Sequence, residues 1–190
     1  VFLVISGFLI TSIIFTKLQQ GTFSPLEFWK RRIRRLYPAL IVLVGVVLLC
    51  GAFILIRPER DNLPIQAAAA MFSFENLLLW KTTTGYWAPT SENMALLHTW
   101  SLSLEEQFYV CLPIVLLLAN RLAKGKEKLI LVLLSLLSFW LCIHVTGRDR
   151  SAAFYLLHTR MWELLLGGIL AIHMVERRAV AGGKLGAVLQ

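Results

Sequence analysis

The sequence predicts an all-α fold, a polytopic transmembrane helix bundle with about five spans and one re-entrant or interfacial helix. Hydrophobic residues make up 57% of the chain and charged residues only 16%. The mean hydropathy is +0.70, far above that of an ordinary soluble domain. Long apolar runs alternate with charged connections. Because one crossing uses roughly 20 apolar residues, 190 residues hold about five crossings.

The apolar runs place the predicted spans in order along the chain. They cover residues 1–15, 37–56, 103–119, 129–146 and 161–175. The first run is already apolar at its first residue, with no basic leader before it, so we interpret it as a truncated span. No internal repeat or Pro/Gly/Ser linker divides the chain. We therefore expect a single incomplete bundle.

Most of the lysines and arginines lie in three connections, residues 16–36, 120–128 and 176–190. These connections alternate correctly for one membrane face, which the positive-inside rule makes cytoplasmic, with 81–98 outside. The net charge of +8 therefore sets orientation, and nucleic acid is not an expected partner. We expect a multi-pass protein in a lipid bilayer.

Residues 63–80 are apolar enough to be considered a further span. A full crossing there would exchange the faces of the later connections and put the basic excess on the wrong side. A re-entrant or surface-lying helix on the outer side fits better. Glu75 and Asn76 in this segment then need protein or a water-filled cavity around them.

The densest polar motif is FWKRRIRRLYPAL, at the predicted cytoplasmic start of the second span. On a helix Arg31, Arg34 and Arg35 share a face, while Arg32 lies about 100° away from Arg31. The motif is at least an orientation and headgroup anchor. It is also a candidate phosphate clamp, because guanidinium groups bind phosphate oxygens bidentately. Pro38 is expected at the helix start, where its missing N–H costs little.

A second polar motif, LLHTWSLSLEEQFYVCLP, lies at the predicted outer start of the third span. Ionisable groups there are costly unless they face the bundle interior. Ser103 and Glu106 fit a capping box, which explains Glu106 as part of a helix start. Gln can replace Glu in that role.

Glu105 is not needed for the capping box, so it is the stronger functional candidate. It shares a helix face with Ser101 and Tyr109, which form a polar stripe with it. His98 is an interfacial histidine in one interpretation and a catalytic histidine in another. Trp100 is most simply an interfacial belt residue.

The last motif, HTRMWELLLGGILA, contains a predicted structural ion pair between Arg160 and Glu163 at i,i+3 spacing. Gly167 and Gly168 would let a neighbouring helix approach closely. His144, His158 and His173 have no partner that the sequence identifies. The three cysteines match no zinc or disulfide spacing, so no metal site is expected.

Four motifs, FLVISGFLIT, FWKRRIRRLYPAL, LLHTWSLSLEEQFY and RMWELLLGGILA, together resemble the family-3 integral membrane acyltransferases. This family includes bacterial O-antigen and peptidoglycan O-acetyltransferases. The motifs follow the family order over nearly the whole chain, so residues 1–190 resemble a partial acyltransferase domain truncated at both ends. The segment HTWSLS and the last motif are most similar to sequences of the subgroup that often carries an appended extracytoplasmic SGNH-type domain.

The resemblance implies an enzyme of the bacterial inner or plasma membrane with no bound cofactor. Its donor would be cytoplasmic acetyl-CoA or another acyl-CoA, and its acceptor a hydroxyl of a cell-surface glycan. The principal histidine would lie on a span before this chain. The family motifs then assign donor binding to Arg31, Arg32, Arg34 and Arg35, and a supporting catalytic role to Glu105. His98, Ser101 and Tyr109 are supporting candidates.

Two other functions are compatible with the residues. Intramembrane charges also mark permeation pathways, so a transporter of a lipid-linked sugar or small anion is the alternative. A non-catalytic membrane scaffold is a third interpretation. Transporters often carry paired broken helices in two related halves, and this sequence shows no such repeat.

Overall fold

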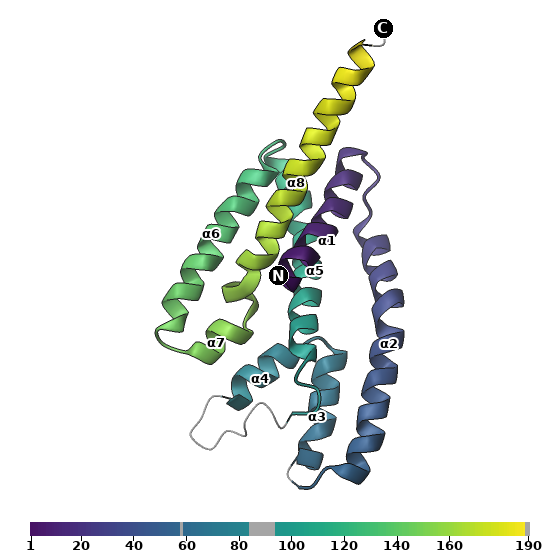
Figure 1. The fold of residues 1–190 in the computed structure, drawn as a ribbon, viewed down its shortest axis with the longest axis vertical. Coiled ribbons are helices and arrows are strands. Elements are labelled where there is room, and N and C mark those ends of the chain that lie inside the picture. Colours follow the sequence, from purple (N-terminus) through teal and green to yellow (C-terminus); the bar gives the residue numbers. More distant parts are fainter. Residues whose placement is uncertain (58, 84–93, 189–190) are drawn as a thin grey trace. The chain divides into compact units, whose positions relative to one another are not determined.

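The structure is a computed structural model, and it describes residues 1–57, 59–83 and 94–188. Helices account for nearly all of these residues, and none of them is in a β-strand (Figure 1). The helices in chain order are α1 Phe2–Gln19, α2 Pro25–Ile54, α3 Glu59–Met71, α4 Glu75–Thr83, α5 Thr99–Leu122, α6 Glu127–Thr146, α7 Arg150–Tyr155 and α8 Leu157–Val188.

Four helices of the described chain, α1, α2, α5 and α6, are long and apolar enough to cross a membrane. The predicted all-α membrane bundle is therefore confirmed. The fifth predicted span, residues 161–175, lies within α8. Its apolar stretch is short and is bracketed or interrupted by Arg160, Glu163, Glu176 and Arg177.

The chain divides into two compact units. The first consists of residues 1–23, 108–142 and 160–190, and the second of residues 24–107 and 143–159. In the first unit α1 and α8 pack backbone to backbone: a Cβ on Gly7 would collide with the Leu164 carbonyl, and one on Gly167 with the Val4 carbonyl. The predicted close approach of a helix at Gly167 and Gly168 is confirmed, with Thr11 beside Gly168.

In the second unit α3 packs along α2, α4 packs against α3, and α7 packs against α4. The core between α2 and α3 contains Leu40, Val44, Ala67 and Ala70, and Leu96 completes it from the segment before α5. This core holds the C-terminal half of α2, helix α3 and the segment leading into α5 in one body.

Helix α2 begins twelve residues earlier than the predicted span at residue 37. Ser24 is its N-cap, Pro25 takes the first helical position and Glu27 lies in the first turn, a strong start signal. Pro38 is consequently inside the helix, not at its start as predicted. Its ring cannot donate to the carbonyl of Arg34, so one helical hydrogen bond is lost there.

Residues 63–80 do not form a single spanning helix. The chain turns between α3 and α4 at Ser73, whose φ of 59° is left-handed. At about 1.5 Å per residue neither short helix reaches across a hydrocarbon core of about 30 Å. This agrees with the expectation that the segment does not cross the membrane in one pass.

Candidate functional site: a buried polar cluster in the second unit

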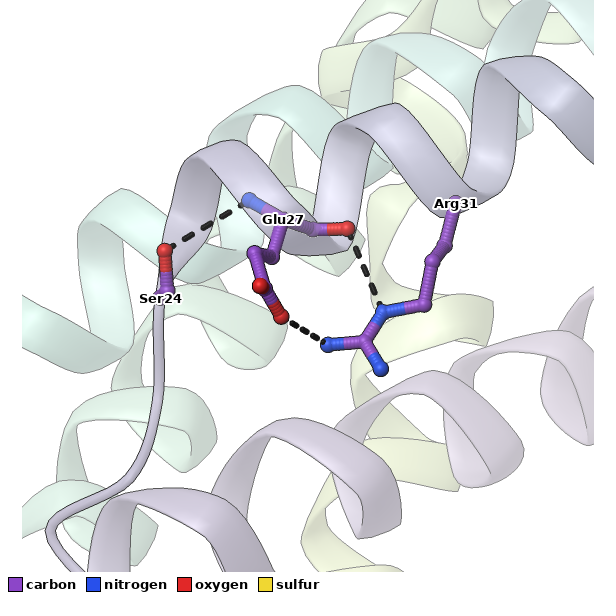
Figure 2. Close-up of polar contacts among 3 residues, drawn as sticks. All are labelled: Ser24, Glu27 and Arg31. Carbon is purple, nitrogen blue, oxygen red and sulfur yellow. Dashed lines mark hydrogen bonds and ion pairs between the residues drawn. The ribbon is translucent and has the colours of Figure 1, made fainter.

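Arg31 belongs to the exposed start of α2. Ser24 Oγ accepts a hydrogen bond from the Glu27 N–H at 3.5 Å, and the Glu27 carboxylate pairs with Arg31 Nη2 at 2.6 Å (Figure 2). The Arg31 Nε also donates to the Glu27 carbonyl at 3.3 Å. The two paired side chains are 62% and 67% exposed, so solvent screens their attraction and the pair adds little stability.

Arg32 points to a different partner, in the second polar motif. Its Nε lies 3.4 Å from Glu106 Oε1, and the two side chains are only 19% and 18% exposed. This ion pair joins α2 to α5 across 74 positions of sequence. Both residues lie about two turns inside their helices. The basic-residue distribution predicts these two motifs at opposite membrane faces, and their contact within one unit contradicts that placement.

The pair also corrects the interpretation of Glu106. Helix α5 begins at Thr99, so Ser103 lies in its second turn and cannot act as an N-cap. The predicted capping box of Ser103 and Glu106 is wrong, because the helix extends through the polar residues before it. Glu106 instead supplies the carboxylate for Arg32.

The remaining predicted site residues occupy different environments. Glu105 is 3% exposed, as expected for a carboxylate facing the interior. Arg34 and Arg35 are exposed, and no ion pair joins either of them to another described residue. Arg31 and Arg32 thus each pair with a carboxylate, whereas Arg34 and Arg35 are exposed; a joint role of the four arginines in donor binding stays a prediction.

The supporting candidates are not brought together either. His98 is exposed, and Ser101 is half-buried at the start of α5. Tyr109 belongs to the first unit, where its buried hydroxyl shares a hydrogen bond with Ser6 of α1. Of the polar stripe predicted for Ser101, Glu105 and Tyr109, the Tyr109 side chain is thus engaged in a contact between α5 and α1.

A hydrogen-bond network that the sequence did not predict lies beside the ion pair. Gln107 Nε2 donates to the Ser73 carbonyl and to Asn76 Oδ1, both at 2.8 Å. Asn76 Nδ2 in turn donates to the Tyr155 carbonyl at 3.0 Å. The network ties the turn between α3 and α4 to α5 and α7. Its signal in the sequence was Asn76 itself, a polar residue within an apolar segment.

Glu75 and Asn76 are both completely buried, which confirms that protein surrounds them. Neither Glu75 oxygen has a hydrogen-bond partner among the described residues. Burial alone raises the pKa of this carboxyl from 4.5 to about 7. Glu75 is thus the anomalous member of the cluster, since buried polar groups are normally satisfied.

Asp149 fixes the neighbouring helix α7. Its Oδ1 accepts the Ala152 N–H at 2.9 Å as an N-cap, and its Oδ2 accepts the Trp80 indole N–H at 3.0 Å. The Trp80 and backbone hydrogen bonds lower the pKa of Asp149, so it stays ionised at neutral pH. Asp149 therefore anchors α4 to α7, and the cap signal in GRDRSAA was available in the sequence.

Chemically, the second unit holds guanidinium, carboxylate and amide groups in an otherwise apolar chain. Such groups are costly within a bundle and mark functional sites. No group of three or more metal-ligating side chains gathers among the described residues. The predicted ion pair of Arg160 and Glu163 is confirmed at 2.8 Å in the first unit.

Comparison with known proteins identifies the family. Residues 1–189 match the family model described as an acyltransferase domain. The chain is 34% identical over 182 residues to an uncharacterised protein of Haemophilus influenzae, covering 91% of this chain and 73% of that protein.

Two named relatives are longer. A peptidoglycan O-acetyltransferase of Listeria monocytogenes is 36% identical over 177 residues, and an O-acetyltransferase of Staphylococcus aureus is 35% identical over 178 residues. Each match covers 90% of this chain but 28% of the relative. No solved structure matches the chain. The four membrane-compatible helices, the motifs and these matches lead to one conclusion: the chain belongs to the membrane acyltransferase family defined by this domain.

Proposed function

We propose that the chain is part of an enzyme that transfers an acetyl or similar acyl group from cytoplasmic acyl-CoA to hydroxyls of a cell-surface glycan. The two named relatives, an O-acetyltransferase and a peptidoglycan O-acetyltransferase, support acetyl as the group and peptidoglycan as an acceptor to test first. The enzyme would be a multi-pass protein of a bacterial cell membrane, with an appended SGNH-type domain as a further candidate partner.

The observation that carries this proposal is the ion pair of Arg32 with Glu106 beside the buried Glu105. It places cationic and anionic groups of both family motifs in one polar cluster inside an apolar chain. Charged groups kept in such surroundings serve a site. The reaction moves the acyl carbonyl from the donor sulfur to the acceptor oxygen, and the hydroxyl proton leaves to the thiol.

Donor binding is proposed for Arg34 and Arg35. They are exposed on the basic segment, and no described carboxylate competes for them. Phosphate oxygens of acyl-CoA match the guanidinium fork in charge and geometry. Arg32 would act by holding Glu106 and the start of α5. The histidine that activates the acceptor hydroxyl is expected on the complete protein outside this chain.

The test is acyl transfer by the full-length protein in reconstituted membranes. Radiolabelled acetyl-CoA is supplied on one face and peptidoglycan fragments on the other, and ester-linked label in the glycan is measured after mild alkaline release. We expect acetyl-CoA-dependent labelling. Well-inserted protein that transfers no label from acetyl-CoA to any surface glycan would contradict the proposal. Movement of an intact lipid-linked sugar without ester formation would favour a transporter.

A further inference from the structure

Glu75 is the first residue of helix α4, and its side chain is completely buried. Neither of its carboxylate oxygens finds a hydrogen-bond partner among the described residues. An ionised carboxylate in such a place would carry a large desolvation cost without compensation. The arrangement therefore suits the neutral, protonated acid and not the anion.

Charged neighbours do not change this conclusion. Desolvation is the only cause that raises the pKa of Glu75 to about 7, with no contribution from another charge. Ionisable groups lie on α4 itself, on α3 and α7, which pack against it, and on the part of α5 that is joined to it through Asn76. These groups are Lys81, Glu59, Arg60, Asp61, Arg150, Tyr155, Glu105 and Glu106. Arg60, Asp61, Lys81 and Arg150 are exposed to solvent.

The position of Glu75 connects it to the polar cluster. It lies two residues after the left-handed Ser73 and directly precedes Asn76. Asn76 and the Ser73 carbonyl are the two groups to which Gln107 donates. Gln107 is adjacent in α5 to Glu106, which binds Arg32. A displacement at the start of α4 would therefore be transmitted by the Gln107 side chain to the neighbouring Glu106 and its ion pair with Arg32.

We propose that Glu75 is a positioning residue whose proton holds the turn between α3 and α4, and through Asn76 and Gln107 holds the start of α5, in the geometry of the acyl-transfer site. Ionisation draws the carboxylate toward water and opens the contact of Asn76 with Gln107. The inference rests on the proposed function, since it describes how that site is kept in order. It makes the site sensitive to pH near neutrality.

The first test compares wild-type protein with Glu75→Gln, whose amide copies the neutral acid and cannot ionise. The measured quantity is the ratio of acyl transfer at about pH 8.5 to that at about pH 6. Because the described geometry belongs to the protonated acid, wild-type activity should fall as pH rises through about 7. The ratio should be on the order of tenfold higher in Glu75→Gln.

Glu59→Gln is the matched control, because Glu59 lies at the start of α3 outside the network. It should leave the activity ratio at its wild-type value. Superimposable pH profiles for wild type and Glu75→Gln would overturn the inference, as would an equal change in Glu59→Gln.

A second measurement detects the proton on Glu75 directly and does not depend on acyl-transfer activity. Infrared difference spectroscopy of the full-length wild-type protein should show a protonated carboxylic acid band that disappears as pH rises through about 7. The band should be missing in Glu75→Gln. A carboxylate already ionised at about pH 6 would refute the inference. Absence of acyl transfer would instead refute the proposed function, while the infrared result would stand by itself.

Discussion

Arg31 and Arg32 are neighbours in the chain, yet each holds a different carboxylate. Arg31 pairs with Glu27 one turn before it, in solvent, and Arg32 pairs with Glu106 on another helix. Helical spacing predicts the first contact, because residues four apart share a face. It cannot predict the second, since nothing in the local pattern of either motif specifies which distant carboxylate the guanidinium meets. The sequence therefore singled out the two polar motifs but not the pairing between them.

Arg34 and Arg35 should bind the donor phosphates through bidentate hydrogen bonds from their guanidinium groups. Arg34→Lys and Arg35→Lys keep the positive charge but lose bidentate geometry, so we expect the KM for acyl-CoA to rise about tenfold, equivalent to roughly 1.4 kcal/mol. Arg57→Lys is the control, because Arg57 is an exposed arginine outside the basic motif, beside Asp61. Donor titrations in reconstituted membranes measure the effect. Unchanged KM values at both positions would leave only an anchoring role for this segment.

The ion pair of Arg32 and Glu106 should behave as one energetic unit. Removing either charge deprives the partly buried partner of this ion pair, so Arg32→Gln and Glu106→Gln should each cost about 1–3 kcal/mol of unfolding free energy. The double variant should cost clearly less than the sum. Thermal unfolding in detergent gives the three values. Strict additivity would mean that the two side chains do not interact in the protein.

Among the helices, apolar runs located the long ones well but placed the starts of α2 and α5 too late. Helix α2 gains its basic segment and α5 gains Thr99 to Leu102, because polar residues within a helix do not extend an apolar run. The cap at Ser24 with Pro25 and Glu27 was a readable signal for the true start of α2. The break at Ser73 was less readable, since serine rarely adopts a left-handed φ.

The close crossing of α1 and α8 depends on two glycines, Gly7 and Gly167, which have no side chain. Gly7→Ala and Gly167→Ala would each drive a methyl group into backbone atoms of the facing helix, which cannot move aside like a side chain. We expect each to lower the unfolding free energy by at least about 1–3 kcal/mol. Gly45→Ala is the control, because it has open space around it within α2 and should be neutral or slightly stabilising. Equal melting temperatures for all three variants would disprove close backbone packing at this crossing.

At the scale of the whole molecule, the distribution of basic residues predicts which segments face the cytoplasm. On this basis residues 16–36, 120–128 and 176–190 should be inside, and residues 81–98 outside. The contact of Arg32 with Glu106 brings the starts of α2 and α5 to similar depths, so labelling of 16–36 and of 81–98 is the decisive comparison. Single cysteines introduced into each segment, after replacement of Cys50, Cys111 and Cys142, can be labelled with a membrane-impermeant maleimide. Labelling of 120–128 from outside would reverse the orientation of the later helices. Residues 84–93 lie outside the described part of the chain, so labelling is their direct test.

We propose that the polar cluster of Glu105 and the ion pair of Arg32 and Glu106 serves acyl transfer to a surface glycan. The most direct test of this claim is the ester-linked acyl content of surface glycan in a deletion strain that expresses the full-length protein. Content is normalised to membrane-inserted protein. Wild-type and Glu59→Gln proteins should restore acylation, while Glu105→Gln should reduce it by at least about tenfold. Full acylation by the Glu105→Gln protein would contradict the claim.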